Sequence, residues 1–166
     1  NTLRSKRVVT SIPQDPANWK TMKVDKFVAH SNTLKCPYNA ERMAKEGTYN
    51  MLLGDLGEKE YMGSKETYDT ANENFKKTFS KGFPFEVLEV QSGPPVISCT
   101  WHHWAEHSGP YTAADGTVYK ATGTRIEMFG QGVIKLTADL QITEVQMYFD
   151  RASFVKQLMA GGPVDA

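Results

Sequence analysis

The chain has 166 residues, of which 40% are apolar and 11% aromatic, and its 19 basic residues balance 19 acidic ones. This length and apolar content suit one domain with a sizeable core rather than a disordered chain. A net charge of zero creates no field toward a phosphate backbone or an anionic membrane, so the composition argues against nucleic acid as a partner.

The sequence also argues against membrane insertion and against a disulfide-bonded, secreted protein. No run approaches the roughly 20 apolar residues of a membrane span, and the first residues lack the apolar core of a secretory signal. Cys36 and Cys99 make no disulfide framework and lack metal-ligand spacing. We therefore expect a cytoplasmic protein that uses no metal and no cofactor.

The first residues of the chain predict little regular structure. Residues 1–23 are polar, and Pro13 and Pro16 disfavour helix and strand, so this segment is expected to be a flexible arm. A short strand is expected at residues 24–29.

Two helices are expected next. Asn39 can cap a helix over residues 40–53, in which Gly47 is unfavourable. Ser64 can cap a second helix, which ends before Pro84. The apolar residues at helical spacing in this second helix are Tyr68, Ala71, Phe75 and Phe79.

Four strands and a short helix complete the pattern. The strands are expected at residues 85–91, 95–106, 118–136 and 141–150. Gly130 and Gly132 interrupt the third strand, where glycine commonly marks a bulge or a sharp bend that would curl the sheet. Asp150 can cap the closing helix, and residues 159–166 are expected to form a mobile tail. This order predicts one α+β domain over residues 24–158, with helices covering the concave face of a curved antiparallel sheet.

Alternation along the second strand separates its side chains into two sets. The set predicted to face inward is Ile97, Cys99, Trp101, His103 and Ala105. The set predicted to face outward is Ser98, Thr100, His102 and Trp104. His103 therefore faces an apolar interior, where it is either a proton carrier near pH 7 or a buried histidine bonded to a backbone carbonyl or a tyrosine.

The spacing of the histidines disfavours a metal site. His102 and His103 point to opposite faces, and residues four apart on a strand, such as His103 and His107, lie roughly 13 Å from each other. The same distance separates Cys99 from His103, which disfavours a Cys–His catalytic pair and favours Cys99 as a small core residue. Glu127 is expected to face solvent, because its neighbours in the strand are apolar.

Three stretches, residues 123–128 (GTRIEM), 140–150 (LQITEVQMYFD) and 157–158 (QL), resemble the C-terminal half of SnoaL-like proteins in the nuclear transport factor two superfamily. Five more resemble the plant pathogen-related group of that family: residues 47–53 (GTYNMLL), 82–90 (GFPFEVLEV), 92–95 (SGPP), 103–104 (HW) and 129–132 (FGQG). The likeness runs over residues 26–158. It implies a cone-shaped α+β barrel with a pocket for a small molecule.

The resemblance also bears on individual residues. Catalytic relatives carry an inward aspartate on the last strand, and Met147 stands near that position here, so the expected acid is missing. An inward polar group on a preceding strand is matched by His103. Relatives pair as homodimers through the outer face of the sheet, where Trp104 is expected.

We predict a mostly apolar cavity for a small hydrophobic molecule. Its ligand-binding residues are predicted to be Trp101, Cys99, Met51, Tyr68, Phe75, Met128 and Met147. The first hypothesis is a cofactor-independent isomerase, cyclase or dehydratase in which His103 moves a proton and Tyr49 or Tyr119 hydrogen-bonds the developing oxyanion. The alternative is a non-catalytic binding or defence-associated protein. A carboxylate or tyrosine within reach of His103 would favour catalysis, and a bond to backbone alone would favour binding.

Overall fold

The computed structural model describes residues 14–32 and 36–164, and its centre is a curved six-stranded sheet. The strand order is β2-β1-β8-β7-β4-β3. The bounds are β1 Val28–Ser31, β2 Tyr38–Asn39, β3 Phe85–Ser92, β4 Val96–Glu106, β7 Arg125–Leu136 and β8 Ile142–Phe149. Neighbouring strands are antiparallel except β1 and β8, which are parallel, so the expected antiparallel sheet is mixed at this pair.

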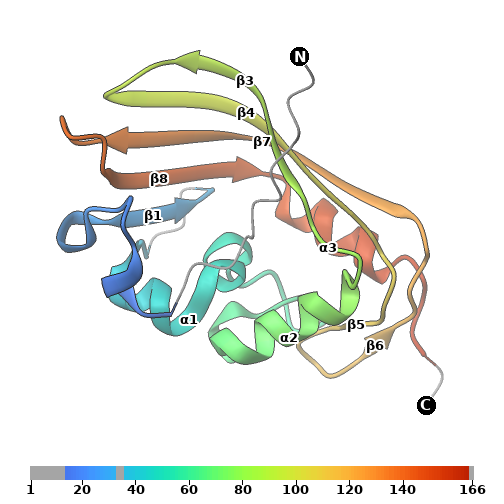
Figure 1. Cartoon of the computed structure of the whole chain (residues 1–166). Helices are drawn as coiled ribbons and strands as arrows, with labels where there is room; N and C mark the ends of the chain where they lie inside the picture. The colour runs from blue at the N-terminus through green and yellow to red at the C-terminus, as the bar shows by residue number, and fades with distance from the viewer. Residues whose placement is uncertain (1–13, 33–35, 165–166) are drawn as a thin grey trace.

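The helices lie on the concave side of the sheet (Figure 1). They are α1 Ala40–Leu53, α2 Tyr68–Thr78 and α3 Arg151–Met159. A small hairpin, β5 Tyr111–Thr112 and β6 Val118–Tyr119, lies beside α2. This is the predicted α+β cone. Among the residues that the structure describes, no helix combines the length and the apolar character needed to cross a membrane.

Local capping explains where the helices begin. The Asn39 side chain accepts from the Arg42 amide at 2.8 Å, and the Asp150 side chain accepts from the Ser153 amide at 2.8 Å, so both predicted caps are confirmed. The predicted cap of the second helix is wrong. Thr67, not Ser64, caps α2, because Ser64 lies in a separate 3₁₀ turn, Gly63–Lys65.

Gly47 breaks α1 into two halves. Its φ of 85° lies in the left-handed region, which glycine adopts without strain. A Cβ at this position would lie 3.0 Å from the Tyr68 ring, so α2 also packs closely here. Residues on both sides of the kink, Met43 before it and Tyr49 and Met51 after it, line a cavity on the concave face.

The long third strand of the sequence prediction is two strands. Residues 118–119 pair with β5 in the small hairpin, and Gly123, with a φ of 67°, lies between this hairpin and β7. The bulge expected at Gly130 and Gly132 is wrong, because β4 and β7 keep one register through both glycines. Gly130 is needed for close packing instead: a Cβ there would lie 2.2 Å from Cζ2 of Trp101.

The described part of the predicted arm is folded onto the domain. Residues 14–27, which we call the N-terminal strap, contain the 3₁₀ turns Pro16–Asn18 and Val24–Lys26. Trp19 is only 6% exposed and packs edge-on against Phe27, with 5.6 Å between the ring centroids. Burial of these two aromatic rings stabilises the folded strap, although its prolines disfavour regular secondary structure. The expected strand at residues 24–29 therefore begins later, as β1. Residues 1–13 lie outside the described part.

The predicted tail is likewise held for most of its length. The Val164 amide donates to the Val118 carbonyl at 2.7 Å, and the Lys120 amide donates to the Gly162 carbonyl at 3.0 Å. These bonds add residues 162–164 to the edge of β6 and contradict a mobile tail there. Residues 165–166 lie outside the described part.

The core consists of two hydrophobic clusters. The larger lies between α2, α3 and the sheet and includes Phe75, Trp101 and Phe154. The smaller lies between the strap, β1 and α1 and includes Trp19, Phe27, Met43 and Met51, which are buried.

Candidate ligand-binding site

A cavity of about 170 Å³ lies where the two clusters meet. Six of the ten predicted site residues line it: Tyr49, Met51, Trp101, His103, Met128 and Met147. The two halves of its wall have different origins. The strap and α1 supply one side, and the inward faces of β3, β4, β7 and β8 supply the other.

The inward faces follow the predicted alternation. Trp101 and His103 of β4 line the cavity, and Val145, Met147 and Phe149 of β8 do the same. His102 lies on the opposite face of β4, where its ring stacks on Phe129 at 4.3 Å. The predicted parity of β4 is confirmed, and Met147 of β8 faces inward as the resemblance implies.

Three predicted residues lie behind or beside the cavity wall. Phe75 is fully buried and stacks on Tyr49 at 4.2 Å, so it supports a lining residue without lining the cavity itself. Tyr68 packs on Gly47 at the start of α2. Cys99 is buried beside Gly132 and Met147, and burial raises the pKa of its thiol, as expected for a core cysteine.

Tyr119, a predicted oxyanion donor, is placed elsewhere in the fold. It belongs to β6, and its ring lies 6.5 Å from that of Tyr111 in the small hairpin. It does not line the cavity, because residues 118–119 pair with β5 and not with the main sheet. Of the two predicted tyrosines, Tyr49 alone is a cavity residue.

His103 is the polar centre of the cavity wall. Its Nδ1 lies 2.7 Å from the Pro84 carbonyl oxygen, which can only accept, so Nδ1 carries the proton and Nε2 carries the lone pair. The imidazole stacks on Phe83 at 3.4 Å and meets Phe85 edge-on at 5.5 Å. Burial among these rings lowers the pKa of His103 to about 4, although the bond to Pro84 opposes the shift.

The rest of the wall is almost entirely apolar. Besides His103, the polar residues that the structure describes there are Thr48 and Tyr49, and none of the described lining residues is an aspartate or a glutamate. Met147 occupies the inward position where catalytic relatives were expected to have their acid. Within the described residues, the hydrogen-bond partner of His103 is backbone and not a carboxylate or tyrosine.

His107 lies away from His103 and from the cavity. His107 is fully buried near the small hairpin, where its Nδ1 lies 3.2 Å from Oγ1 of Thr122. In the part of the chain that the structure describes, no group of three or more histidine, cysteine, aspartate or glutamate side chains could hold a metal ion.

Sequence reasoning missed the contribution of the strap and of β3. Met22 and Phe27 line the cavity from the strap, Phe85 lines it from β3, and Pro84 orients His103. Residues 14–23 of the strap are predicted to be an arm because their polar residues and prolines outnumber their apolar ones, and residues 24–27 are predicted to begin a strand. Trp19 and Phe27 were the available signal, since large aromatic residues in a polar segment are commonly anchors.

Comparisons with known proteins agree with this architecture. No family model matches the chain. A protein from Hordeum vulgare named "Pathogen-related protein" is 27% identical over 156 residues, which are 91% of this chain and 64% of the barley protein. The chain thus spans about two thirds of the length of the curated relative that it matches.

Two solved structures from Streptomyces show the same fold. One, from Streptomyces galilaeus, is described as a hydroxylase and has a TM-score of 0.52, 14% identity, and coverage of 85% of this chain and 80% of that one. The other, from Streptomyces antibioticus, is described as a polyketide cyclase and has a TM-score of 0.51, 13% identity, and coverage of 87% and 86%. The predicted likeness to the SnoaL-like cone of the nuclear transport factor two superfamily is confirmed at the level of fold.

Proposed function

We propose that this protein binds a small, largely apolar molecule with one oxygen function in the cone cavity, and that it holds this molecule without transforming it. The observation that carries the proposal is the state of His103, which is neutral, bonded to backbone and surrounded by apolar walls. A pocket of this kind offers shape, burial and few hydrogen-bonding groups. None of the described lining residues is a carboxylate that could work with His103 as an acid and base pair.

The size of the cavity limits the ligand. Pockets for drug-sized molecules occupy roughly 300–1,000 Å³, whereas an apolar cavity of about 150 Å³ in another protein takes up benzene. The cavity here measures about 170 Å³. A one-ring compound fits this volume, and a polycyclic polyketide does not.

The polar contact follows from the tautomer of His103. Because Nδ1–H is bonded to Pro84, Nε2 is the acceptor of the ring, and its natural partner is a ligand hydroxyl. The low pKa keeps the imidazole uncharged at neutral pH, so it favours a neutral ligand over a carboxylate. A phenol or a cyclic alcohol meets these requirements.

Proton-transfer catalysis is the second candidate, and the lone pair on Nε2 of His103 is the observation that favours it. In this reading His103 moves the proton in an isomerisation, cyclisation or dehydration, and Tyr49 stabilises the developing oxyanion. A conjugate-acid pKa of about 4 makes the imidazole a weak base and leaves little acid form at pH 7. We rank catalysis second because His103 is a weak base and because Met147 stands where catalytic relatives were expected to have an aspartate.

Binding can be tested with 4-fluorophenol, a one-ring phenol whose fluorine signal reports the bound state by NMR. We expect saturable binding below about 1 mM. Replacing His103 with phenylalanine keeps a flat ring on Phe83 but removes the hydrogen bond, so His103→Phe should weaken binding about fivefold, which corresponds to about 1 kcal/mol. His102→Phe is the matched control on the opposite face of β4 and should leave the dissociation constant unchanged. Equal effects of the two variants, or no binding to the parental protein, would refute the proposal.

An assay with a second compound distinguishes binding from catalysis. Cyclohex-3-enone is a one-ring ketone that becomes conjugated when a proton moves from one ring carbon to another. The binding proposal expects the protein to leave its isomerisation rate in buffer unchanged. An acceleration that His103→Ala abolishes would instead establish the second candidate.

We further propose two properties of the biological context. The barley relative is named for a relation to pathogens, and a defence-associated role in storing or sensing a metabolite is the context that we propose for this chain. Association as a homodimer through the outer face of the sheet is supported by an aromatic surface there. Phe129 is 60% exposed and covers His102, which stacks on Trp104 at 4.6 Å.

A further inference from the structure

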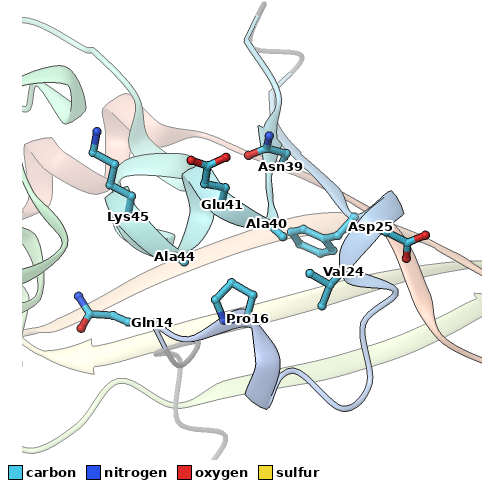
Figure 2. Close-up of a pocket in the computed structure, with 10 residues that line it drawn as sticks. Gln14, Pro16, Val24, Asp25, Asn39, Ala40, Glu41, Ala44 and Lys45 are labelled. Carbon is cyan, nitrogen blue, oxygen red and sulfur yellow. The ribbon is translucent and has the colours of Figure 1, made fainter.

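A second hollow lies on the surface beside the cavity. Figure 2 shows this hollow, a groove between the strap and the first half of α1, with Pro16 and Val24 facing Ala40 and Ala44. Its volume is about 620 Å³, and it is wide open to solvent. The apolar floor is bordered by polar residues: Gln14, Asp25, Asn39, Glu41 and Lys45.

One side chain borders both the groove and the cavity. Among the described residues, Phe27 alone lines both hollows, and it is 3% exposed. On α1, Ala44 lines the groove while its neighbour Met43 lines the cavity, so the wall is also thin on the helix side. The small side chains of Ala40 and Ala44 leave the groove deep at this point.

Phe27 lies between a turn that contains one long backbone bond and strand β1, which begins at Val28 and is paired on both sides. The Phe27 amide donates to the Val24 carbonyl at 3.4 Å, beyond the usual range of 2.7–3.2 Å. The Met22 amide donates to the Trp19 carbonyl at the same length. Firmer attachment to the sheet lies between these turns, where Lys23 donates to Ile142 at 2.9 Å and Ile142 donates to Thr21 at 2.9 Å. The turn that carries Phe27 can therefore move without detaching the whole strap.

We propose that the groove is the entrance to the cavity and that Phe27 is its gate. The ring moves from the shared wall into the space above Ala44 and lets a small neutral molecule pass. This inference rests on the proposed function, because a gate matters only if the cavity is filled and emptied. It assigns Phe27 a kinetic role in addition to its place in the smaller hydrophobic cluster.

A gate has a kinetic signature that a binding residue lacks. Ala44→Phe fills the groove and blocks the space into which the ring moves, but position 44 does not line the cavity. Entry and exit share this route, so both the association and dissociation rate constants should fall about tenfold while the dissociation constant stays the same. Glu73→Phe places the same side chain in a separate surface hollow on α2 and should change neither rate.

The rates can be measured with 4-fluorophenol by fluorine exchange NMR, and the dissociation constants by titration of the same samples. Phe27→Leu is the reciprocal variant: its shorter side chain should speed dissociation about tenfold. Its dissociation constant is expected to change as well, because position 27 also lines the cavity, and far-UV circular dichroism checks that it folds. Intact binding with unchanged rates in both Ala44→Phe and Phe27→Leu would overturn the gate alone. A parental protein that does not bind 4-fluorophenol would overturn the proposed function and the gate together.

Discussion

His102 and His103 show how strongly one residue position changes the chemistry of a side chain. They are neighbours on β4, yet His103 lines the apolar cavity and bonds Pro84, whereas His102 lies in an outer aromatic stack. The Nε2 atom of His102 lies 3.4 Å from Glu127, an acid that His103 lacks. One strand thus presents a histidine with an acidic neighbour outside and a neutral histidine inside.

The buried state of His103 predicts a loss of stability in acid. Its folded pKa of about 4 lies below the ordinary histidine value of 6.5, so the unfolded chain takes up the proton first. The stabilisation is complete above pH 6.5 and is lost as the pH falls toward 4, at roughly 2 kcal/mol between pH 7 and pH 4.5. His107, whose pKa burial also lowers, acts in the same direction.

Urea unfolding of the parental protein and of His103→Phe at the two pH values tests this expectation. The variant should lose roughly 2 kcal/mol less than the parent, because it lacks the group that titrates. An NMR titration should find the His103 resonance moving well below pH 6. Parallel stability curves for the two proteins would contradict the assigned burial of the imidazole.

At the scale of elements, β4 and β7 form the rear wall of the cavity and depend on close packing. The Trp101 indole lies flat over β7 because Gly130 has no side chain, and it meets Phe149 of β8 edge-on at 5.6 Å. Gly132 stands two residues along the same face, where there is room beside Cys99. The two glycines therefore differ in function although they share a strand and a face.

This difference predicts a large loss of stability for one alanine substitution and a small loss for the other. A Cβ at Gly130 would lie 2.2 Å from Trp101 and 2.3 Å from the Tyr148 carbonyl, so Gly130→Ala should lower the free energy of unfolding by about 1–3 kcal/mol or more. At Gly132 the nearest atoms are two sulfurs at 3.5 Å, an ordinary contact. Gly132→Ala should cost less than about 0.5 kcal/mol. Equal costs in denaturant unfolding would show that Trp101 does not require the glycine.

At the scale of the whole molecule, two surfaces of one sheet serve two purposes. The cavity lies between the concave face and the smaller hydrophobic cluster. The convex face carries the aromatic stack of Phe129, His102 and Trp104. Arg125 lies over the Trp104 ring at 5.2 Å and covers part of this stack. A contact between two convex faces would therefore leave both cavities accessible.

The proposed homodimer can be tested on that face. Trp104→Glu introduces a charge into the aromatic surface and should weaken association without unfolding the domain, because Trp104 is only partly buried. Leu140→Glu is the control, since Leu140 is 62% exposed in the turn between β7 and β8. Sedimentation equilibrium at tens of micromolar, a concentration in the range of ordinary interface affinities, should find the parent and Leu140→Glu dimeric. A monomeric parental protein at this concentration would refute the proposed homodimer.

The sequence by itself determined the local features. Periodicity assigned the inward face of β4, and single polar residues, Asn39 and Asp150, marked two helix starts. These features depend on contacts within a few residues, and the sequence records such contacts directly. The resemblance to SnoaL-like proteins added the prediction of a cone-shaped barrel.

Only the tertiary structure decided which distant residues meet. Periodicity states the face on which His103 lies, but not that Pro84 is its hydrogen-bond partner. It also did not separate Tyr119 from the cavity or bring Phe27 into its wall, because strand register and the path of the strap depend on packing between segments far apart in the chain. The free energy of burying Trp19 and Phe27 appears only when the strap, α1 and β1 are assembled, and that assembly forms one wall of the cavity.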